Sequence, residues 1–164
     1  MDINKYTQKS VEAVQKCQSI AGEYGHQEID QEHLLYALLT MDDSLAAKLL
    51  DKMNINTQGV IYQLEKLLNA RPKVQGGQLY ISQTLNQTFT QAEKESAQMG
   101  DEYVSVEHLF LALLSTANKE LKNLFKNFQI TKNRFLQALQ EVRGNQRVTT
   151  DNPEATYDSL SKYG

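Results

Sequence analysis

The chain has 164 residues, 40% of them hydrophobic, and a formal net charge of −3. This length supports one compact domain with its own core, and the charge balance argues against nucleic acid as a partner. A single cysteine excludes an intramolecular disulfide and suits a reducing compartment. Residues 1–6 lack the ordered charged and apolar regions of a signal peptide, and the apolar runs are too short to span a membrane. We therefore expect a cytoplasmic protein.

Two similar stretches, 75 positions apart, dominate the sequence. Residues 29–39 read I-D-Q-E-H-L-L-Y-A-L-L, and residues 104–114 read V-S-V-E-H-L-F-L-A-L-L. The same offset pairs Gly25 with Gly100 and holds without a gap over the surrounding chain. The period exceeds the roughly 20–50 residues of solenoid repeats. It predicts a duplicated half-domain made of several helices.

Apolar residues at helical spacing, together with capping signals, predict four helices in each half. The helices expected in the first half cover about 7–24 and 31–40, then a short one after Ser44 and one from Asn56 or Thr57 that Pro72 stops. Those expected in the second half cover about 82–99, 105–116, 119–128 and 131–143. Val and Ile rarely alternate with polar residues, so no strand is indicated. The predicted fold is all-α, a duplicated four-helix repeat of about eight helices with a pseudo-two-fold axis.

The positions of proline, glycine and polar stretches predict the domain organisation of the chain. Residues 1–70 form repeat one, 71–80 the joint and 81–144 repeat two of a single domain over 1–144. The joint contains Pro72 and a Gly pair, which mark a loop. From 145 to 164 the chain is polar up to Pro153, which indicates a flexible linker.

The starts of the two repeated helices have matching capping signals. Asp30 and Ser105 are good N-cap residues because their side-chain oxygens accept from first-turn amides. His33 and His108 stand three residues later, where a capping box normally has Glu or Gln, and an imidazole nitrogen can accept from the cap amide. Because the two histidines are equivalent under the duplication, we interpret them as structural residues, buried and bonded to their own helix starts.

The residue types that carry catalysis are present but not in catalytic patterns. The sequence has no H-E-x-x-H zinc motif, no phosphate-binding G-x-x-x-x-G-K-[ST] loop and no G-x-S-x-G elbow. We expect Cys17 in the core and His26 in a solvated loop. The acids Asp101, Glu102 and Glu107 are interpreted either as capping and solvated groups or as a polar contact site for a partner. An enzyme using His and acids is the least favoured alternative.

Three motifs resemble a known family. Y-T-Q-K-S at 6–10 and the two E-H-L stretches resemble the Clp repeat domain, which begins Clp-family AAA+ unfoldases and disaggregases. R-P-K-V-Q-G-G at 71–77 and Y-D-S-L-S-K-Y-G at 157–164 resemble the ClpB type. The resemblance implies a non-enzymatic N-terminal domain, in which 145–164 lead towards an absent first ATPase module. ATP and Mg²⁺ would bind only in the absent modules of a homohexameric parent.

The resemblance also implies a function and a site. The domain would bind unfolded or aggregated polypeptide and pass it to the motor, or it would only dock an adaptor or a co-chaperone system. Positions implicated in the family match Thr7, Asp101 and Glu107, which we expect at the rim of a groove between the halves. The candidates for its apolar floor are Tyr80, Ile81, Tyr103 and Val104, which enter helices and are expected to stay partly exposed. Gln91 and Glu95 replace residues that are apolar in related domains.

Overall fold

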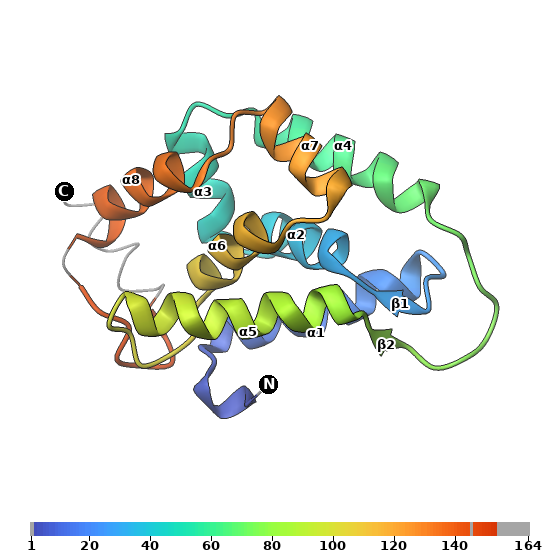
Figure 1. Cartoon of the computed structure of the whole chain (residues 1–164), viewed down its shortest axis with the longest axis horizontal. Helices are drawn as coiled ribbons and strands as arrows, with labels where there is room; N and C mark the ends of the chain where they lie inside the picture. The colour runs from blue at the N-terminus through green and yellow to red at the C-terminus, as the bar shows by residue number, and fades with distance from the viewer. Residues whose placement is uncertain (1, 145, 154–164) are drawn as a thin grey trace.

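The computed structural model describes residues 2–144 and 146–153, and helices dominate it (Figure 1). The first half contains a 3-10 turn and four helices: η1 Ile3–Lys5, α1 Gln8–Glu23, α2 Gln31–Thr40, α3 Leu45–Lys52 and α4 Thr57–Ala70. The second half contains the other four: α5 Gln83–Gln98, α6 Val106–Thr116, α7 Lys119–Asn127 and α8 Lys132–Arg143. The predicted all-α, duplicated four-helix fold is confirmed.

The first helices of the two halves begin and end in the same way. Thr7 caps α1 by accepting from the Ser10 amide at 3.2 Å, and Ser82 caps α5 by accepting from the Leu85 amide at 3.0 Å. After each helix a glycine takes a positive φ, 73° at Gly25 and 71° at Gly100. Side chains other than glycine rarely adopt this conformation, so both helices end at a fixed point.

Two short strands, which the sequence did not indicate, join the halves. β1 Glu28–Ile29 pairs in parallel with β2 Tyr80–Ile81. A separate parallel bridge joins Tyr6 to Val104. Adding 75 to Ile29 gives position 104, and adding 75 to Tyr6 gives position 81, so the bridge is the Ile29–Ile81 pair with the halves exchanged. This reciprocal pairing is what a two-fold relation produces. Pairings of two residues are too short to leave an alternating pattern in the sequence.

The core lies around the two repeated helices, α2 and α6. α1 packs on α2 and α5 on α6, whereas α3 contacts α8 and α4 contacts α7 across the halves. Figure 1 shows α2 and α6 between α1 and α5 on one side and the other four helices on the other. Phe110 of α6 stacks on Phe135 of α8, with ring centroids 4.4 Å apart. Cys17 is buried, as predicted.

The segment after α8 turns back onto the domain. Val148 is completely buried, and its amide donates to Asp101 Oδ1 at 2.9 Å. This differs from the flexible linker expected over 145–164, because residues 146–153 bury Val148 and Pro153 and bond to the Asp101 carboxylate. Residue 145 and residues 154–164 lie outside the described part. Within the described part, no helix is both long and apolar enough to cross a membrane.

Candidate functional site

Two groups of buried polar side chains surround the starts of α2 and α6, and we call them the first and the second polar centre. His33 Nδ1 accepts from the Asp30 amide at 2.9 Å, and His108 Nδ1 accepts from the Ser105 amide at 2.9 Å. Both rings are fully buried, and both helices have the complete reciprocal capping box. The capping predicted at these four residues is therefore present. The Nδ1 atom of each imidazole carries no proton, because it accepts a hydrogen bond.

His26 is part of the first of these centres, and the expectation that it is solvated is wrong. Only 4% of the residue is exposed, because it stacks on Tyr24 and its Nδ1 lies 2.8 Å from His33 Nε2. His33 must carry its proton on Nε2 and donate it to His26 Nδ1. The remaining proton of His26 is then on Nε2, which is buried and has no partner among the described residues. Burial, followed by the charge of Arg71, lowers the pKa of His26.

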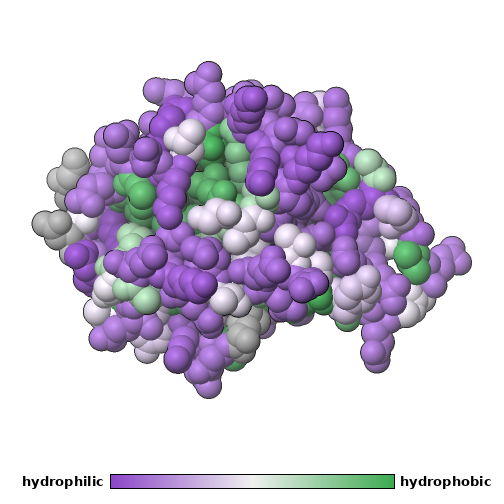
Figure 2. Space-filling view, viewed as in Figure 1, coloured by the Kyte–Doolittle hydropathy of each residue, from purple (hydrophilic) through white to green (hydrophobic). Residues whose placement is uncertain are grey.

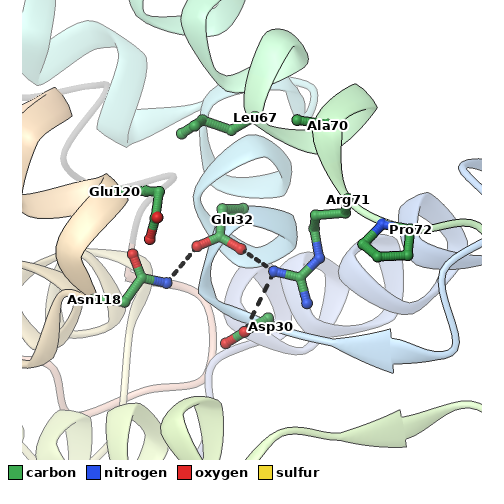
Figure 3. Close-up of a pocket in the computed structure, with 8 residues that line it drawn as sticks. All are labelled: Asp30, Glu32, Leu67, Ala70, Arg71, Pro72, Asn118 and Glu120. Carbon is green, nitrogen blue, oxygen red and sulfur yellow. Dashed lines mark hydrogen bonds and ion pairs between the residues drawn. The ribbon is translucent and has the colours of Figure 1, made fainter.

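Arg71, where α4 ends, holds three carboxylates of the first centre. Its guanidinium lies 2.9 Å from Glu28, 3.4 Å from Asp30 and 2.5 Å from Glu32. Asn118, from the second half, donates to the other oxygen of Glu32 (Figure 3). Burial raises the pKa of Glu32, although the bond from Asn118 opposes it. The polar contacts here span the two halves.

A cavity of about 390 Å³ opens beside Arg71. Its lining residues come from both halves: Asp30, Glu32, Leu67, Ala70, Arg71, Pro72, Asn118 and Glu120. Figure 3 shows Glu32 and Arg71 pointing toward one another at its base, with Leu67 and Ala70 on the opposite side and Glu120 on the side of α7. The cavity therefore combines acidic groups, a paired cation and a small apolar wall.

Asp101 bonds to three other residues in the second polar centre. Its Oδ2 lies 2.7 Å from His108 Nε2, and its Oδ1 accepts from Arg143 and from the Val148 amide. Burial alone would raise the pKa of Asp101, but hydrogen bonds from His108, Val148 and Arg143 outweigh it and hold that pKa below its usual value. Glu107 lies 3.6 Å from the Arg143 guanidinium.

The three residues expected at a groove rim lie inside the protein. Thr7 and Glu107 are 0% and 1% exposed, and the side chain of Asp101 is fully buried. Thr7 is the cap of α1, while Asp101 and Glu107 face Arg143. The groove-rim placement is therefore wrong, because the structure uses their polar groups for capping and internal charge pairing. Their part in binding stays a prediction.

The four floor candidates belong to two different backbone pairings. Tyr80 and Ile81 form β2, while Val104 pairs with Tyr6 and follows Tyr103. Tyr80 is 51% exposed, and Ile81 and Tyr103 are partly buried, as expected. Val104 is only 3% exposed, so the expectation fails for this residue, because its pairing with Tyr6 places it in the core.

Three exposed apolar side chains lie on the joint between the halves. Val74, Leu79 and Tyr80 are about half exposed, and they are three of the five large apolar residues that the described chain exposes. A second cavity, of about 210 Å³, lies against this stretch between Arg71, Tyr80 and the buried His26. Figure 2 shows a mostly polar face with an apolar hollow in its upper part, over α3, α6 and α8. On the face shown, apolar surface is therefore confined to a few places.

Gln31 connects the halves and was missed by the sequence reasoning. It is fully buried; its Nε2 donates to Thr88 Oγ1 at 3.0 Å and to the Thr116 carbonyl at 2.8 Å. Its Oε1 accepts from the Asn118 amide at 2.9 Å. The repeat carried a signal, because the equivalent position 106 is valine, but a polar residue in a first turn is usually interpreted as solvated.

No group of three or more His, Cys, Asp or Glu side chains among residues 2–144 and 146–153 has the arrangement to hold a metal ion. The titratable groups are instead tied to caps and to Arg71 or Arg143. The site offers surfaces for contact with another molecule, through the exposed joint and the cavity between the halves.

The model of the Clp repeat (R) N-terminal domain matches residues 5–128. The whole chain is 44% identical over 169 residues to the chaperone protein ClpB of Bacillus anthracis, and it spans 19% of that protein. Its fold matches the Hsp104 N-terminal domain from Candida albicans with a TM-score of 0.81, at 20% identity, covering 92% of this chain and 99% of that one. It also matches a complex of the ClpV N-domain with a VipB peptide, with a TM-score of 0.65, at 21% identity, covering 90% and 92%. Its sequence thus matches the N-terminal part of ClpB, and this chain belongs to the Clp repeat N-terminal domain family.

Proposed function

We propose that this domain engages unfolded or aggregated polypeptide and passes it to the AAA+ motor of a ClpB-type disaggregase. The parent would be a cytoplasmic homohexamer that binds ATP and Mg²⁺ in modules outside this chain, and the domain itself would catalyse nothing. The observation that carries the proposal is the exposure of Val74, Leu79 and Tyr80 on the joint, at 47%, 46% and 51%. Three exposed apolar side chains on one short stretch of an otherwise polar surface make this stretch a candidate interaction site.

The edge of β2 suits an extended client. The hydrogen bonds to β1 use the amides of Tyr80 and Ser82, which donate to Gln27 and Ile29 at 3.0 and 2.9 Å. Because successive residues of a strand alternate, the Ile81 amide points to the opposite side. An extended segment can add to such an edge through its backbone, while Tyr80 contacts its apolar side chains at about 25 cal/mol per Å² before ordering costs. Such contacts are weak and tolerate many sequences, which suits a client that must be released.

Thr7, Asp101 and Glu107 support this function indirectly. Because they are buried, they would act by holding α1 and the second polar centre in place rather than by touching a client. Tyr103, which is partly buried, remains a secondary contact candidate, and Val104 would contribute through its pairing with Tyr6.

The alternative function is the docking of a folded adaptor without client contact. The cavity between the halves favours it, because Glu120, Asp30 and Glu32 give a defined acidic surface beside Arg71. The ClpV N-domain that resembles this fold is described in complex with a VipB peptide. A peptide partner of defined sequence would use side-chain recognition at the cavity rather than the backbone edge of β2.

Tyr80→Ser and Tyr62→Ser form a matched pair of variants that tests the proposal. Both tyrosines are about half exposed, but Tyr62 lies on α4, away from the joint. The probe is a chemically unfolded, reduced model protein, added to the isotopically labelled chain while amide shifts are followed. Tyr80→Ser should weaken binding about tenfold, as the loss of about 1.4 kcal/mol does, and Tyr62→Ser should leave it unchanged.

The shift map separates the two functions. Perturbations at 74–81 support client engagement. Perturbations confined to Asp30, Asn118 and Glu120, with no difference between the two tyrosine variants, would refute the client site and favour adaptor docking.

A further inference from the structure

The segment after α8 lies beyond the two repeats and is held by contacts with residues of both. We call residues 146–151 the strap. The Glu102 amide donates to the Val148 carbonyl at 2.8 Å, and the Val148 amide donates to Asp101 Oδ1 at 2.9 Å. These two bonds, one between backbone groups and one from a backbone amide to a side-chain carboxylate, fix the strap against the loop between α5 and α6. The Val148 side chain between them is completely buried, although its neighbours Arg147 and Thr149 are exposed.

The far end of the strap meets the start of α1. The Gln8 amide donates to the Asp151 carbonyl at 2.7 Å, and Gln8 Nε2 donates to the Asp151 carboxylate at 3.1 Å. Gln8 is the first residue of α1, where an amide has no partner within the helix. The negative charge of Asp151 is also favourable at this end of the helix dipole. The strap therefore supplies the hydrogen-bond acceptor for a first-turn amide of α1 that has no partner within the helix.

The near end of the strap is tied to the second polar centre. Arg143 Nε donates to the Gln146 carbonyl at 2.8 Å, while the same guanidinium pairs with Asp101. Asp101 thus accepts from α8, from α6 through His108, and from the strap through Val148. A substitution at Asp101 or at Val148 therefore removes a contact that holds the strap.

We infer that the strap is a latch, which docks on Asp101, Glu102 and Gln8 and undocks while the eight helices stay folded. The docked state depends on the buried Val148 side chain, the buried Pro153 just beyond the strap and a few hydrogen bonds, so it is held by less burial than any helix of the core. Undocking turns residues 146–153 into free tether, and eight extended residues span up to about 28 Å. The latch sets how far the domain can move from whatever is attached beyond residue 153.

This inference goes beyond the proposed function and does not depend on it, because no client contact is involved. It also gives Asp101 a role in function that needs no exposed side chain: the residue holds the strap from inside the protein.

The test compares Val148→Asp with Thr149→Asp in the whole chain. Both place a carboxylate on adjacent strap residues, but only the first puts it in the buried position. Cleavage within residues 146–153 by proteinase K, which accepts many sequences, followed by mass spectrometry, reports strap exposure. Amide exchange at Gln8, Glu102 and Val148 reports docking, and exchange in α2 and α6 reports the core.

In Val148→Asp we expect cleavage, and exchange at the amides of residues 8, 102 and 148, to rise at least tenfold, while exchange in α2 and α6 changes less than twofold. Thr149→Asp should resemble the unmodified chain. Equal rates in the unmodified chain and in Val148→Asp would show that the strap is not docked in solution. A parallel rise in α2 and α6 would show that the strap is part of the cooperative core. Either result overturns the inference.

Discussion

His33 Nε2 lies 2.8 Å from His26 Nδ1, and both rings are buried. In the second half the equivalent atom of His108 lies 2.7 Å from Asp101, and 26 plus 75 is 101. The duplicated position therefore holds a neutral acceptor in one half and a charged acceptor in the other. Since His33 Nδ1 accepts from the Asp30 amide, neither histidine of the first half can gain a proton without losing a hydrogen bond.

The first prediction concerns acid stability. Burial, then the charges of Arg71 and His26, lower the pKa of His33 to about 4. His33 is thus neutral in the folded chain, while the unfolded chain binds a proton near pH 6.5. Its contribution to stability is complete above pH 6.5 and is lost as the pH falls towards 4, by at most about 3 kcal/mol. Urea unfolding at pH 7.5, 5.5 and 4.5 measures this loss.

The pH range in which stability is lost distinguishes the effect of His33 from that of Asp101. The pKa of Asp101 is lowered, so its contribution to stability is complete above its usual range and is lost only as the pH falls below that range. A free energy of unfolding that stays constant between pH 7.5 and 4.5 would contradict the first prediction.

The second prediction is that His26→Asp reduces this acid sensitivity. A carboxylate at position 26 reproduces the His108–Asp101 pair of the second half and favours the protonated form of His33. The loss of stability between pH 6.5 and 4 should shrink by about 1 kcal/mol or more, since each pKa unit is worth about 1.4 kcal/mol. His26→Gln is the control, because it removes the imidazole without adding a charge. Identical pH profiles for the two variants would count against the explanation.

The sequence predicted the architecture well because the repeat constrained it twice. Asp30 and Ser105 had the same cap spacing, and Gly25 and Gly100 the same termination, so each half supported the interpretation of the other. Such signals depend on residues within one helical turn of each other, and these residues are close together in the sequence.

The candidate site could be predicted only in part. Tyr80 is exposed as expected, but Thr7 and Glu107 are buried because Thr7 caps a helix whose start is covered and Glu107 faces Arg143. The burial of His26 depends on Tyr24 and on the joint, and that of Gln31 on Thr116 and Asn118 from the other half. Contacts between residues far apart in the chain leave no periodic trace.

The third prediction concerns Arg71→Met. Removing the guanidinium leaves the nearly buried carboxylate of Glu32 without its cation, and the loss of a buried partner is costly. Because the Arg71 side chain is about one-quarter exposed, we expect a loss of about 2 kcal/mol, below the full value for a buried pair. Lys52→Met is the control, since Lys52 pairs with Glu141 at 3.8 Å on the surface and should cost at most about 0.5 kcal/mol. Thermal and urea unfolding of both variants give the comparison, and equal losses would contradict the prediction.

The fourth prediction concerns Gln31→Ala, which removes the bonds of the buried Gln31 side chain to Thr116 and Asn118 and leaves partly buried backbone groups unpaired. We expect a loss of about 2 kcal/mol, from these unpaired groups together with a small cavity. Gln87→Ala is the control, because Gln87 is exposed on α5 and alanine is a good helix former. A loss below about 0.5 kcal/mol in Gln31→Ala would show that water replaces these bonds easily.

The last prediction concerns Thr7, Asp101 and Glu107, whose buried positions imply that alanine variants act through stability. Thr7→Ala removes the cap of α1 and should cost about 1 kcal/mol. Asp101→Ala leaves Arg143 and His108 buried without their acceptor and should cost about 3 kcal/mol. Thr131→Ala removes a comparable cap from α8 and is the matched control for Thr7→Ala. Client binding is measured at a temperature where circular dichroism shows each variant fully folded. The folded variants should bind an unfolded model protein as the unmodified chain does, and Thr7→Ala should match Thr131→Ala. If folded Thr7→Ala and Glu107→Ala lose binding while Thr131→Ala retains it, these residues contact clients themselves, and the binding surface includes the start of α1 as well as the joint.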